Sequence, residues 1–176
     1  MNRVFINFVT VFLLCAGGNT VLAEKIKEGD LAPEFGLRDQ DNQLHSLENY
    51  RDKWLVLYFY PKDDTPGCTT EACEFRDAIF SFRKFNCQIL GISMDHRMSH
   101  KAFADKYSLP FPLLADTDGS TSSAYGVKTK VLGMIFAKRQ TFLIDPNGRV
   151  AKHYAKVNPA THSLQILADL KELINP

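Results

Sequence analysis

Several short runs of hydrophobic residues have the length and composition of β-strands. Residues 54–60, Trp-Leu-Val-Leu-Tyr-Phe-Tyr, are continuously apolar, which predicts a strand buried on both faces and ended by Pro61. Similar runs predict central strands over 88–93 and 140–145. Weaker patterns, bounded by turn residues, predict further strands over 32–37, 43–47 and 149–154.

Between these runs, apolar residues recur every three or four positions, as they do in amphipathic helices. The longest such pattern predicts one helix from Pro66 to Phe85, and shorter ones predict helices over 99–107 and 161–174. A turn at residues 146–148, Pro-Asn-Gly, predicts a hairpin before the last helix. This order of elements predicts an α/β protein, a thioredoxin-like three-layer sandwich with a central mixed β-sheet.

The composition suits one globular domain. The chain has 176 residues, of which 45% are hydrophobic and 23% charged. There are 21 lysines and arginines against 20 aspartates and glutamates, so the formal net charge is +1. A charge so close to neutral argues against nucleic acid or an anionic membrane surface as the main partner.

The N-terminus has the pattern of a signal peptide. Arg3 precedes an apolar stretch over residues 4–16, and Val21-Leu22-Ala23 offers a cleavage site before Glu24. The stretch is too short for a comfortable membrane span. We therefore expect a signal peptide over 1–23, export to the periplasm or the medium, and a mature domain over 24–176 without stable membrane association. An uncleaved membrane anchor is the alternative.

The cysteine count favours a redox-active pair over structural disulfides. Of the four cysteines, Cys15 would leave with the signal peptide, and Cys68, Cys73 and Cys87 would remain. An odd number of cysteines in an exported domain leaves at least one free thiol. Cys87, at the start of an apolar run, is expected to be an inert packing thiol.

Cys68 lies where a strand gives way to a helix, and this position favours a nucleophilic thiolate. Thr65 can serve as the N-cap with Pro66 at the first helical position, which places Cys68 in the first turn. Free N–H groups and the positive end of the helix dipole there favour the thiolate and can hold a peroxide oxygen. We expect the Thr65 hydroxyl near the same spot, Pro61 as a shield from water, and Arg139 as the guanidinium that completes the site.

The spacing of Cys68 and Cys73 has a mechanical consequence. Five residues of intact helix separate their Cα atoms by roughly 8–9 Å, whereas a disulfide needs roughly 4.4–6.8 Å. A disulfide between them therefore requires the start of the helix to unwind. In this scheme, Cys68 attacks a peroxide and becomes a sulfenic acid, Cys73 condenses with it, and an external dithiol reduces the disulfide.

The run over residues 58–73 is Tyr-Phe-Tyr-Pro-Lys-Asp-Asp-Thr-Pro-Gly-Cys-Thr-Thr-Glu-Ala-Cys. It resembles the signature of the peroxiredoxins, and within them of the bacterioferritin comigratory protein (BCP/PrxQ) subfamily. The resemblance covers nearly all of residues 25–176. It implies a monomer that reduces hydrogen peroxide and organic hydroperoxides, without a metal or prosthetic group, and a thioredoxin or thioredoxin-like reductant. The family's proline, threonine, peroxidatic cysteine, arginine and resolving cysteine fall on Pro61, Thr65, Cys68, Arg139 and Cys73.

Other interpretations of the same residues remain open. The cysteine pair also suits a thiol–disulfide oxidoreductase or a redox sensor, although the usual oxidoreductase motif is C-x-x-C. It could also be half of a metal site, but no second ligand pair has convincing spacing. His96 and His100 are expected to be solvated. Glu71 either hydrogen-bonds near the site or simply suits a helix N-terminus.

Overall fold

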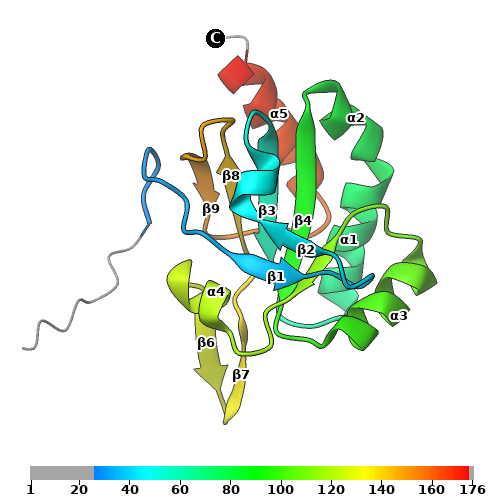
Figure 1. The fold of residues 1–176 in the computed structure, drawn as a ribbon. Coiled ribbons are helices and arrows are strands. Elements are labelled where there is room, and N and C mark those ends of the chain that lie inside the picture. Colours follow the sequence, from blue (N-terminus) through cyan, green and yellow to red (C-terminus); the bar gives the residue numbers. More distant parts are fainter. Residues whose placement is uncertain (1–25, 175–176) are drawn as a thin grey trace, which may run out of the picture.

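A five-stranded mixed sheet forms the centre of the molecule (Figure 1). The computed structural model describes residues 26–174. The strand order is β5-β4-β3-β8-β9, with β3, β4 and β5 parallel and β8 antiparallel to both of its neighbours. The bounds of these strands are β3 Trp54–Phe59, β4 Cys87–Ser93, β5 Leu113–Ala115, β8 Gln140–Ile144 and β9 Val150–Tyr154.

The remaining elements cover the two faces of this sheet. The helices are α1 Pro66–Asp77, α2 Ile79–Lys84, α3 Arg97–Tyr107, α4 Ser120–Ala124 and α5 His162–Ile174, with a short 3-10 helix η1 at Leu47–Tyr50. Two hairpins are β1 Gly36–Arg38 with β2 Leu44–Ser46, and β6 Lys128–Val131 with β7 Met134–Ala137. The predicted thioredoxin-like three-layer sandwich with a mixed sheet is confirmed.

Alternate residues of β3 enter two separate hydrophobic cores. Val56 and Tyr58 pack with the side chains of α1, α2, α3 and α5 on one face of the sheet. Leu55, Leu57 and Phe59 pack on the other face, with residues of η1 and of the segment after α4. This two-sided burial is the reason why β3 is apolar at every position.

The long helix predicted over residues 66–85 is interrupted. It consists of α1 and α2, which meet at Ala78, where the backbone has φ −90° and ψ 0°. Phe75, Ile79 and Phe82 all stay in the core across the break. Because the apolar stripe is continuous and no glycine or proline marks the position, the sequence pattern does not reveal the interruption.

The hairpin of β6 and β7 was not predicted from the sequence. It projects from the lower end of the molecule in Figure 1, and a two-residue turn at Leu132 and Gly133 joins its strands. No helix within residues 26–174 is long and apolar enough to cross a membrane. The signal peptide predicted over 1–23 lies outside the described residues.

Candidate active site

Cys68 lies at the junction between the central strand β3 and helix α1. Strand β3 ends at Phe59, a short turn follows, and α1 begins at Pro66 with Thr65 as its N-cap residue. Cys68 is the third residue of the helix and only 1% exposed. The first backbone bond of the helix runs from Thr69 N to Thr65 O. The N–H groups of Gly67 and Cys68 precede this bond, so they have no acceptor within the helix.

Arg139 comes to Cys68 from a distant part of the chain. It directly precedes β8, and the antiparallel register pairs Gln140 with Phe59. Arg139 therefore lies beyond the end of β3, beside the start of α1. Its Nη2 donates a hydrogen bond to Cys68 Sγ at 3.1 Å. A Cβ atom at Gly67 would lie 3.2 Å from this same Nη2, so the glycine makes room for the guanidinium.

Glu71 holds the other side of the guanidinium. It lies one helical turn after Cys68 and is fully buried. Nη1 of Arg139 donates a hydrogen bond to its Oε2, while its Oε1 has no partner within the described part of the chain. Burial raises the pKa of Glu71 to about 7, against the opposing effect of Arg139. Of the two roles left open for this residue, the structure supports hydrogen bonding at the site.

Tyr58 on β3 lies close enough to Glu71 and Cys68 to feel their charges, and it was missed by sequence reasoning. Its hydroxyl is buried without a partner among residues 26–174. Burial raises its pKa well above the ordinary value, and the neighbouring charges of Glu71 and Cys68 act in the same direction. Its ring fills the space above Gly91, where a Cβ atom would lie 2.7 Å from the tyrosine oxygen. The continuously apolar pattern of β3 gives no sign of such a contact.

Thr65 and Pro61 occupy positions that differ in part from expectation. The Thr65 hydroxyl donates to the carbonyl oxygen of Lys62 at 3.0 Å and makes no cap hydrogen bond to the helix. Pro61 is half-buried and lines a groove of about 430 Å³ together with residues such as Met94 and Phe136. Thr65 is thus the N-cap residue of α1, as predicted, but its hydroxyl points to the preceding turn.

A buried polar network fixes the turn that leads to Cys68. The Tyr60 hydroxyl donates to Asp63 Oδ1 at 2.7 Å, and His100 Nδ1 lies 2.9 Å from Asp63 Oδ2. The backbone N–H of Asp63 donates to Asp95 Oδ2 at 2.8 Å. The expectation that His100 is solvated is therefore wrong, because its partner Asp63 lies far away in the sequence. His96 is exposed, as expected.

The two other described cysteines differ in their surroundings. Cys73 lies within the intact helix α1 and is half-buried, whereas Cys87 begins β4 and is buried. Burial raises the pKa of the Cys87 thiol to about 12. All three described cysteines are free thiols. The separation of Cys68 and Cys73 along an intact helix agrees with the spacing argument made from the sequence.

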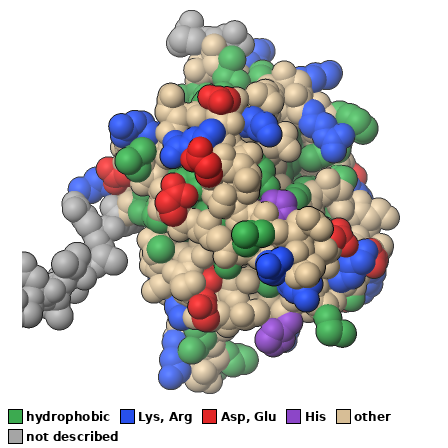
Figure 2. Space-filling view, viewed as in Figure 1, with side chains coloured by type: hydrophobic (Ala, Val, Ile, Leu, Met, Phe, Trp, Pro, Cys, Tyr) green, Lys and Arg blue, Asp and Glu red, His purple; other side chains and the backbone are tan. Residues whose placement is uncertain are grey.

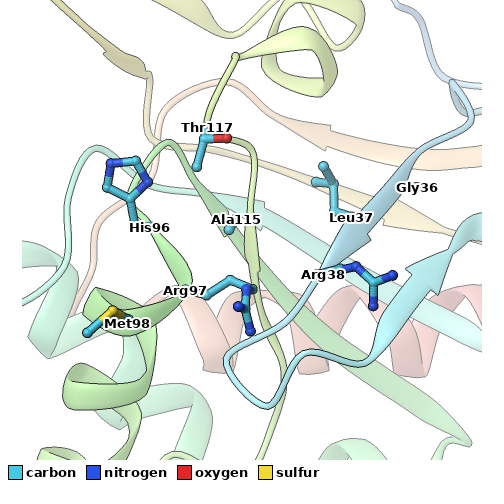
Figure 3. Close-up of a pocket in the computed structure, with 8 residues that line it drawn as sticks. All are labelled: Gly36, Leu37, Arg38, His96, Arg97, Met98, Ala115 and Thr117. Atoms are coloured by element: carbon cyan, nitrogen blue, oxygen red, sulfur yellow. The ribbon is translucent and has the colours of Figure 1, made fainter.

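A second hollow lies away from this site. A cavity of about 490 Å³ opens between β1, the start of α3 and the end of β5 (Figure 3). Arg38, His96 and Arg97 are among its lining residues, and none of the residues around Cys68 takes part.

Within residues 26–174, no group of three or more histidine, cysteine or acidic side chains is arranged to hold a metal ion.

Known proteins match both the sequence and the fold. The profile of the AhpC/TSA family matches residues 29–153. This chain belongs to that family. Peroxiredoxin Q from Oryza sativa subsp. japonica, named as chloroplastic, is 40% identical over 158 residues, which cover 89% of this chain and 72% of that protein. Peroxiredoxin Bcp from Bacillus subtilis (strain 168) is 41% identical over 152 residues, which cover 84% of this chain and 97% of that protein.

Solved structures give the same result. A cysteine-to-serine mutant of PrxQ from Xylella fastidiosa superposes with a TM-score of 0.81 at 33% identity, covering 85% of this chain and 98% of that one. Peroxidoxin BcpB from Mycobacterium tuberculosis superposes with a TM-score of 0.79 at 35% identity, covering 84% and 98%. The protein is thus a peroxiredoxin similar to PrxQ and Bcp, and the predicted resemblance is confirmed. It is a thiol peroxidase, and peroxiredoxins act on peroxides with thioredoxin-like reductants.

The prediction that this peroxiredoxin is exported to the periplasm or secreted is wrong. Its plant relatives are named as chloroplastic proteins. The prediction rested on residues 1–23, where one arginine precedes an apolar stretch. Such a stretch is recognised by its general composition, and that composition does not by itself specify a compartment.

Proposed function

We propose that Cys68 is the peroxidatic nucleophile of this enzyme and that Cys73 resolves the oxidised product. The observation that carries the proposal is the 3.1 Å hydrogen bond from Arg139 Nη2 to Cys68 Sγ at the start of α1. A guanidinium and free helix N–H groups both stabilise negative charge on sulfur. The buried Glu71 holds the guanidinium in this position.

The first step is a two-electron transfer from sulfur to peroxide. The Cys68 thiolate attacks one oxygen of R–O–O–H, an S–O bond forms, and the O–O bond breaks. The departing RO⁻ takes a proton and leaves as an alcohol, or as water when the substrate is hydrogen peroxide. Cys68 is oxidised to a sulfenic acid. Arg139 and the N–H groups of the first helical turn stabilise the negative charge that develops on the departing oxygen.

Thr65 and Pro61 take supporting roles in this proposal. The Thr65 hydroxyl, which donates to Lys62 O at 3.0 Å in this structure, turns to the peroxide when substrate is bound. Its present hydrogen bond lies at the exposed side of the turn, where water can replace the lost partner. Pro61 has no N–H group and covers one side of the entrance, so it limits access of water to Cys68.

Resolution requires a change in α1. The sulfenic acid of Cys68 condenses with the Cys73 thiol, a disulfide forms, and water leaves. In the intact helix these residues are about 8–9 Å apart at Cα, so the turns before Cys73 must unwind first. Cys73 is half-buried, which leaves the new disulfide within reach of a thioredoxin-like dithiol. That dithiol returns both cysteines to thiols and is itself oxidised.

The remaining parts of the proposal concern the whole protein. The peroxiredoxin domain spans residues 24–176, the enzyme works as a monomer, and it has no stable membrane association. A single chain supplies Cys68, Cys73 and Arg139, so no second subunit is required for the cycle. Sedimentation of the reduced protein at enzyme-assay concentrations tests the monomer directly.

The mechanism is tested by combining kinetics with disulfide mapping. The reduced protein is mixed with hydrogen peroxide in a stopped-flow instrument, quenched with a thiol-alkylating agent, and digested without reductant. We expect a Cys68–Cys73 disulfide by mass spectrometry. Cys73→Ser should retain the rapid first oxidation but lose at least roughly tenfold in steady-state turnover with a dithiol reductant. A disulfide that joins Cys68 to Cys87 would refute the assignment of the resolving residue.

A further inference from the structure

The tip of the β6–β7 hairpin exposes hydrophobic side chains to solvent. Leu132 is 93% exposed and Met134 is 65% exposed, and Val131 and Ile135 are about half-exposed beside them. The hairpin projects from the body of the protein (Figure 1), and hydrophobic and basic side chains gather at this lower end of the surface (Figure 2). Four exposed apolar side chains within five residues at one projecting tip are more than the scattered exposure that is normal for a protein surface.

Leu132 is also an unusual choice for the turn itself. Leu132 and Gly133 are its two central residues, with φ of +50° and +84°. Two-residue hairpin turns with positive φ at both positions strongly favour Asn-Gly or Asp-Gly, because a bulky side chain disfavours this backbone conformation. Folding alone would therefore select asparagine at residue 132. A leucine that is both conformationally unfavourable and almost fully exposed indicates a contact outside the folded chain.

The hairpin segment carries charges of one sign. Residues 128–138 contain Lys128, Lys130 and Lys138 and no acidic residue. Lys130 lies next to the tip, paired with Ile135 across the hairpin. Lys128 Nζ donates to the backbone oxygen of Asp118 at the base of the hairpin. The chain as a whole is almost neutral, so its net charge conceals a segment that is locally basic.

One side of the hairpin lines a groove that also contains Pro61, a residue of the turn before α1. The groove of about 430 Å³ is lined by Met134, Ile135 and Phe136 on the hairpin and by Pro61, Lys62 and Met94 on the body. Asp95 also lines it, but its carboxylate accepts hydrogen bonds from the Ser93 hydroxyl and from Asp63 N, both at 2.8 Å. The groove is thus lined mainly by apolar side chains, and it brings Lys62 of the body to the same side of the molecule as Met134 and Ile135.

We propose that the β6–β7 hairpin docks the enzyme transiently on the surface of an anionic phospholipid membrane. Leu132 and its apolar neighbours enter the boundary between headgroups and acyl chains, while Lys130 and Lys62 contact lipid phosphates. An apolar tip flanked by lysines matches both layers of such a surface. Contact through one hairpin is weak and reversible, so it is compatible with the proposal that the enzyme has no stable membrane association. The docking itself does not depend on the proposed peroxidase mechanism. Only its consequence does, namely the reduction of phospholipid hydroperoxides at the membrane where they form.

Vesicle co-sedimentation tests the docking without reference to catalysis. The probes are vesicles of phosphatidylglycerol and phosphatidylcholine in equal parts, and vesicles of phosphatidylcholine alone. We expect the reduced full-length chain to sediment with the former, and added salt to release it. Leu132→Asn places a favoured residue in the turn while removing the apolar contact, so it should fold well and bind about tenfold more weakly. Lys130→Glu should also weaken binding by about tenfold or more.

A matched control and a catalytic assay complete the test. Leu164→Asn changes another exposed leucine, on α5, and should bind vesicles like the wild type. All three variants should reduce hydrogen peroxide at the wild-type rate, whereas Leu132→Asn should reduce phospholipid hydroperoxide in anionic vesicles more slowly. If hydrogen peroxide is reduced but the wild type does not bind anionic vesicles, the docking inference alone fails. If vesicles bind but hydrogen peroxide is not reduced, the proposed mechanism alone fails.

A second measurement tests whether the hairpin tip binds another copy of this chain instead of a membrane. Sedimentation velocity of the wild type and of Leu132→Asn shows whether the patch joins two copies of the chain. A dimer that Leu132→Asn dissociates, combined with no vesicle binding, would overturn the membrane assignment. Equal loss of vesicle binding in Leu132→Asn and Leu164→Asn would overturn it as well, because the effect would then not belong to the hairpin.

Discussion

Cys68 and Cys87 are equally buried, at 1% exposure each, yet they occupy opposite chemical environments. Cys68 lies in the first turn of α1 with the guanidinium of Arg139 at 3.1 Å. Cys87 begins β4 beside apolar core residues, and burial raises the pKa of its thiol to about 12. The comparison teaches that equal burial does not imply equal chemistry: burial alone disfavours a thiolate, whereas a facing guanidinium and a helix N-terminus favour one.

Replacing each cysteine in turn should give the largest difference. Cys68→Ser removes the proposed nucleophile and should lower peroxide consumption by about a thousandfold or more, on the order of other nucleophile deletions. Cys87→Ser should stay within about twofold of the wild type, because no step of the cycle uses its thiol. Peroxide consumption with an excess of dithiol measures both variants. Activity of Cys68→Ser near the wild-type rate would show that another residue is the nucleophile.

Removing the guanidinium should make the surroundings of Cys68 resemble those of Cys87. Arg139→Met leaves a buried thiol without its cationic neighbour and should lower the rate of the first oxidation by about 100- to 1000-fold. Arg149→Met, at an exposed arginine that hydrogen-bonds Gly29 O, serves as the control and should oxidise normally. Stopped-flow fluorescence with hydrogen peroxide measures this step. Equal rates for both variants would remove Arg139 from the mechanism.

Glu71, the buried acid beside Cys68, should make the free energy of unfolding depend on pH. The pKa of Glu71 is raised to about 7 in the folded protein, from about 4.5 when unfolded. Between these values the folded state binds the extra proton, so Glu71 contributes stability at low pH that is lost as pH rises to about 7. The expected loss is roughly 3 kcal/mol. Urea unfolding of the wild type and of Glu71→Gln from about pH 4.5 to about pH 7.5 measures it.

The titration of His162 changes stability with pH in the direction opposite to that of Glu71. Burial lowers its pKa from 6.5 to about 4, so its contribution to stability is lost as pH falls below about 6.5. In Glu71→Gln the contribution of Glu71 is removed and that of His162 remains. Between about pH 4.5 and about pH 6.5 the stability of this variant should therefore rise with pH. A Glu71→Gln profile that runs parallel to the wild type would mean that Glu71 does not titrate there.

The smallest effect is expected from the packing of Cys87. Cys87→Ala removes one buried sulfur atom from the core and should lower the free energy of unfolding by about 1 kcal/mol, without a change in peroxide consumption. Urea denaturation at neutral pH measures the loss. An appreciable loss of activity with unchanged stability would give Cys87 a chemical role and weaken the contrast with Cys68.

The parts of the fold that were predicted from the sequence are those with strong local patterns. Strands β3, β4 and β8 were placed to within one residue because they are almost continuously apolar. The break between α1 and α2 and the β6–β7 hairpin were not predicted. Ala78 carries no helix-breaking signal, and the hairpin turn holds leucine where asparagine is usual.

The candidate site likewise contains features that local sequence predicts and contacts that it does not. Cys68 was placed in the first turn of its helix from the adjacent Thr65 and Pro66, and the structure agrees. Contacts between distant segments, such as Asp63 with His100 or Tyr58 above Gly91, leave no mark in local sequence. Arg139 was predicted to supply the guanidinium of the site, and the structure brings it to Cys68. The catalytic roles of these residues stay predictions until the variants are measured.

Arg139 follows Cys68 by 71 residues, and the strand that holds it in place, β8, comes later still. Because synthesis on the ribosome proceeds from the N-terminus, the cysteine emerges long before its guanidinium partner. Until β8 pairs with β3, Cys68 has no Arg139 beside it. If Arg139 activates Cys68 as proposed, a growing chain carries a thiol without its activating partner, and we expect fast reaction with peroxide only after β8 has paired with β3.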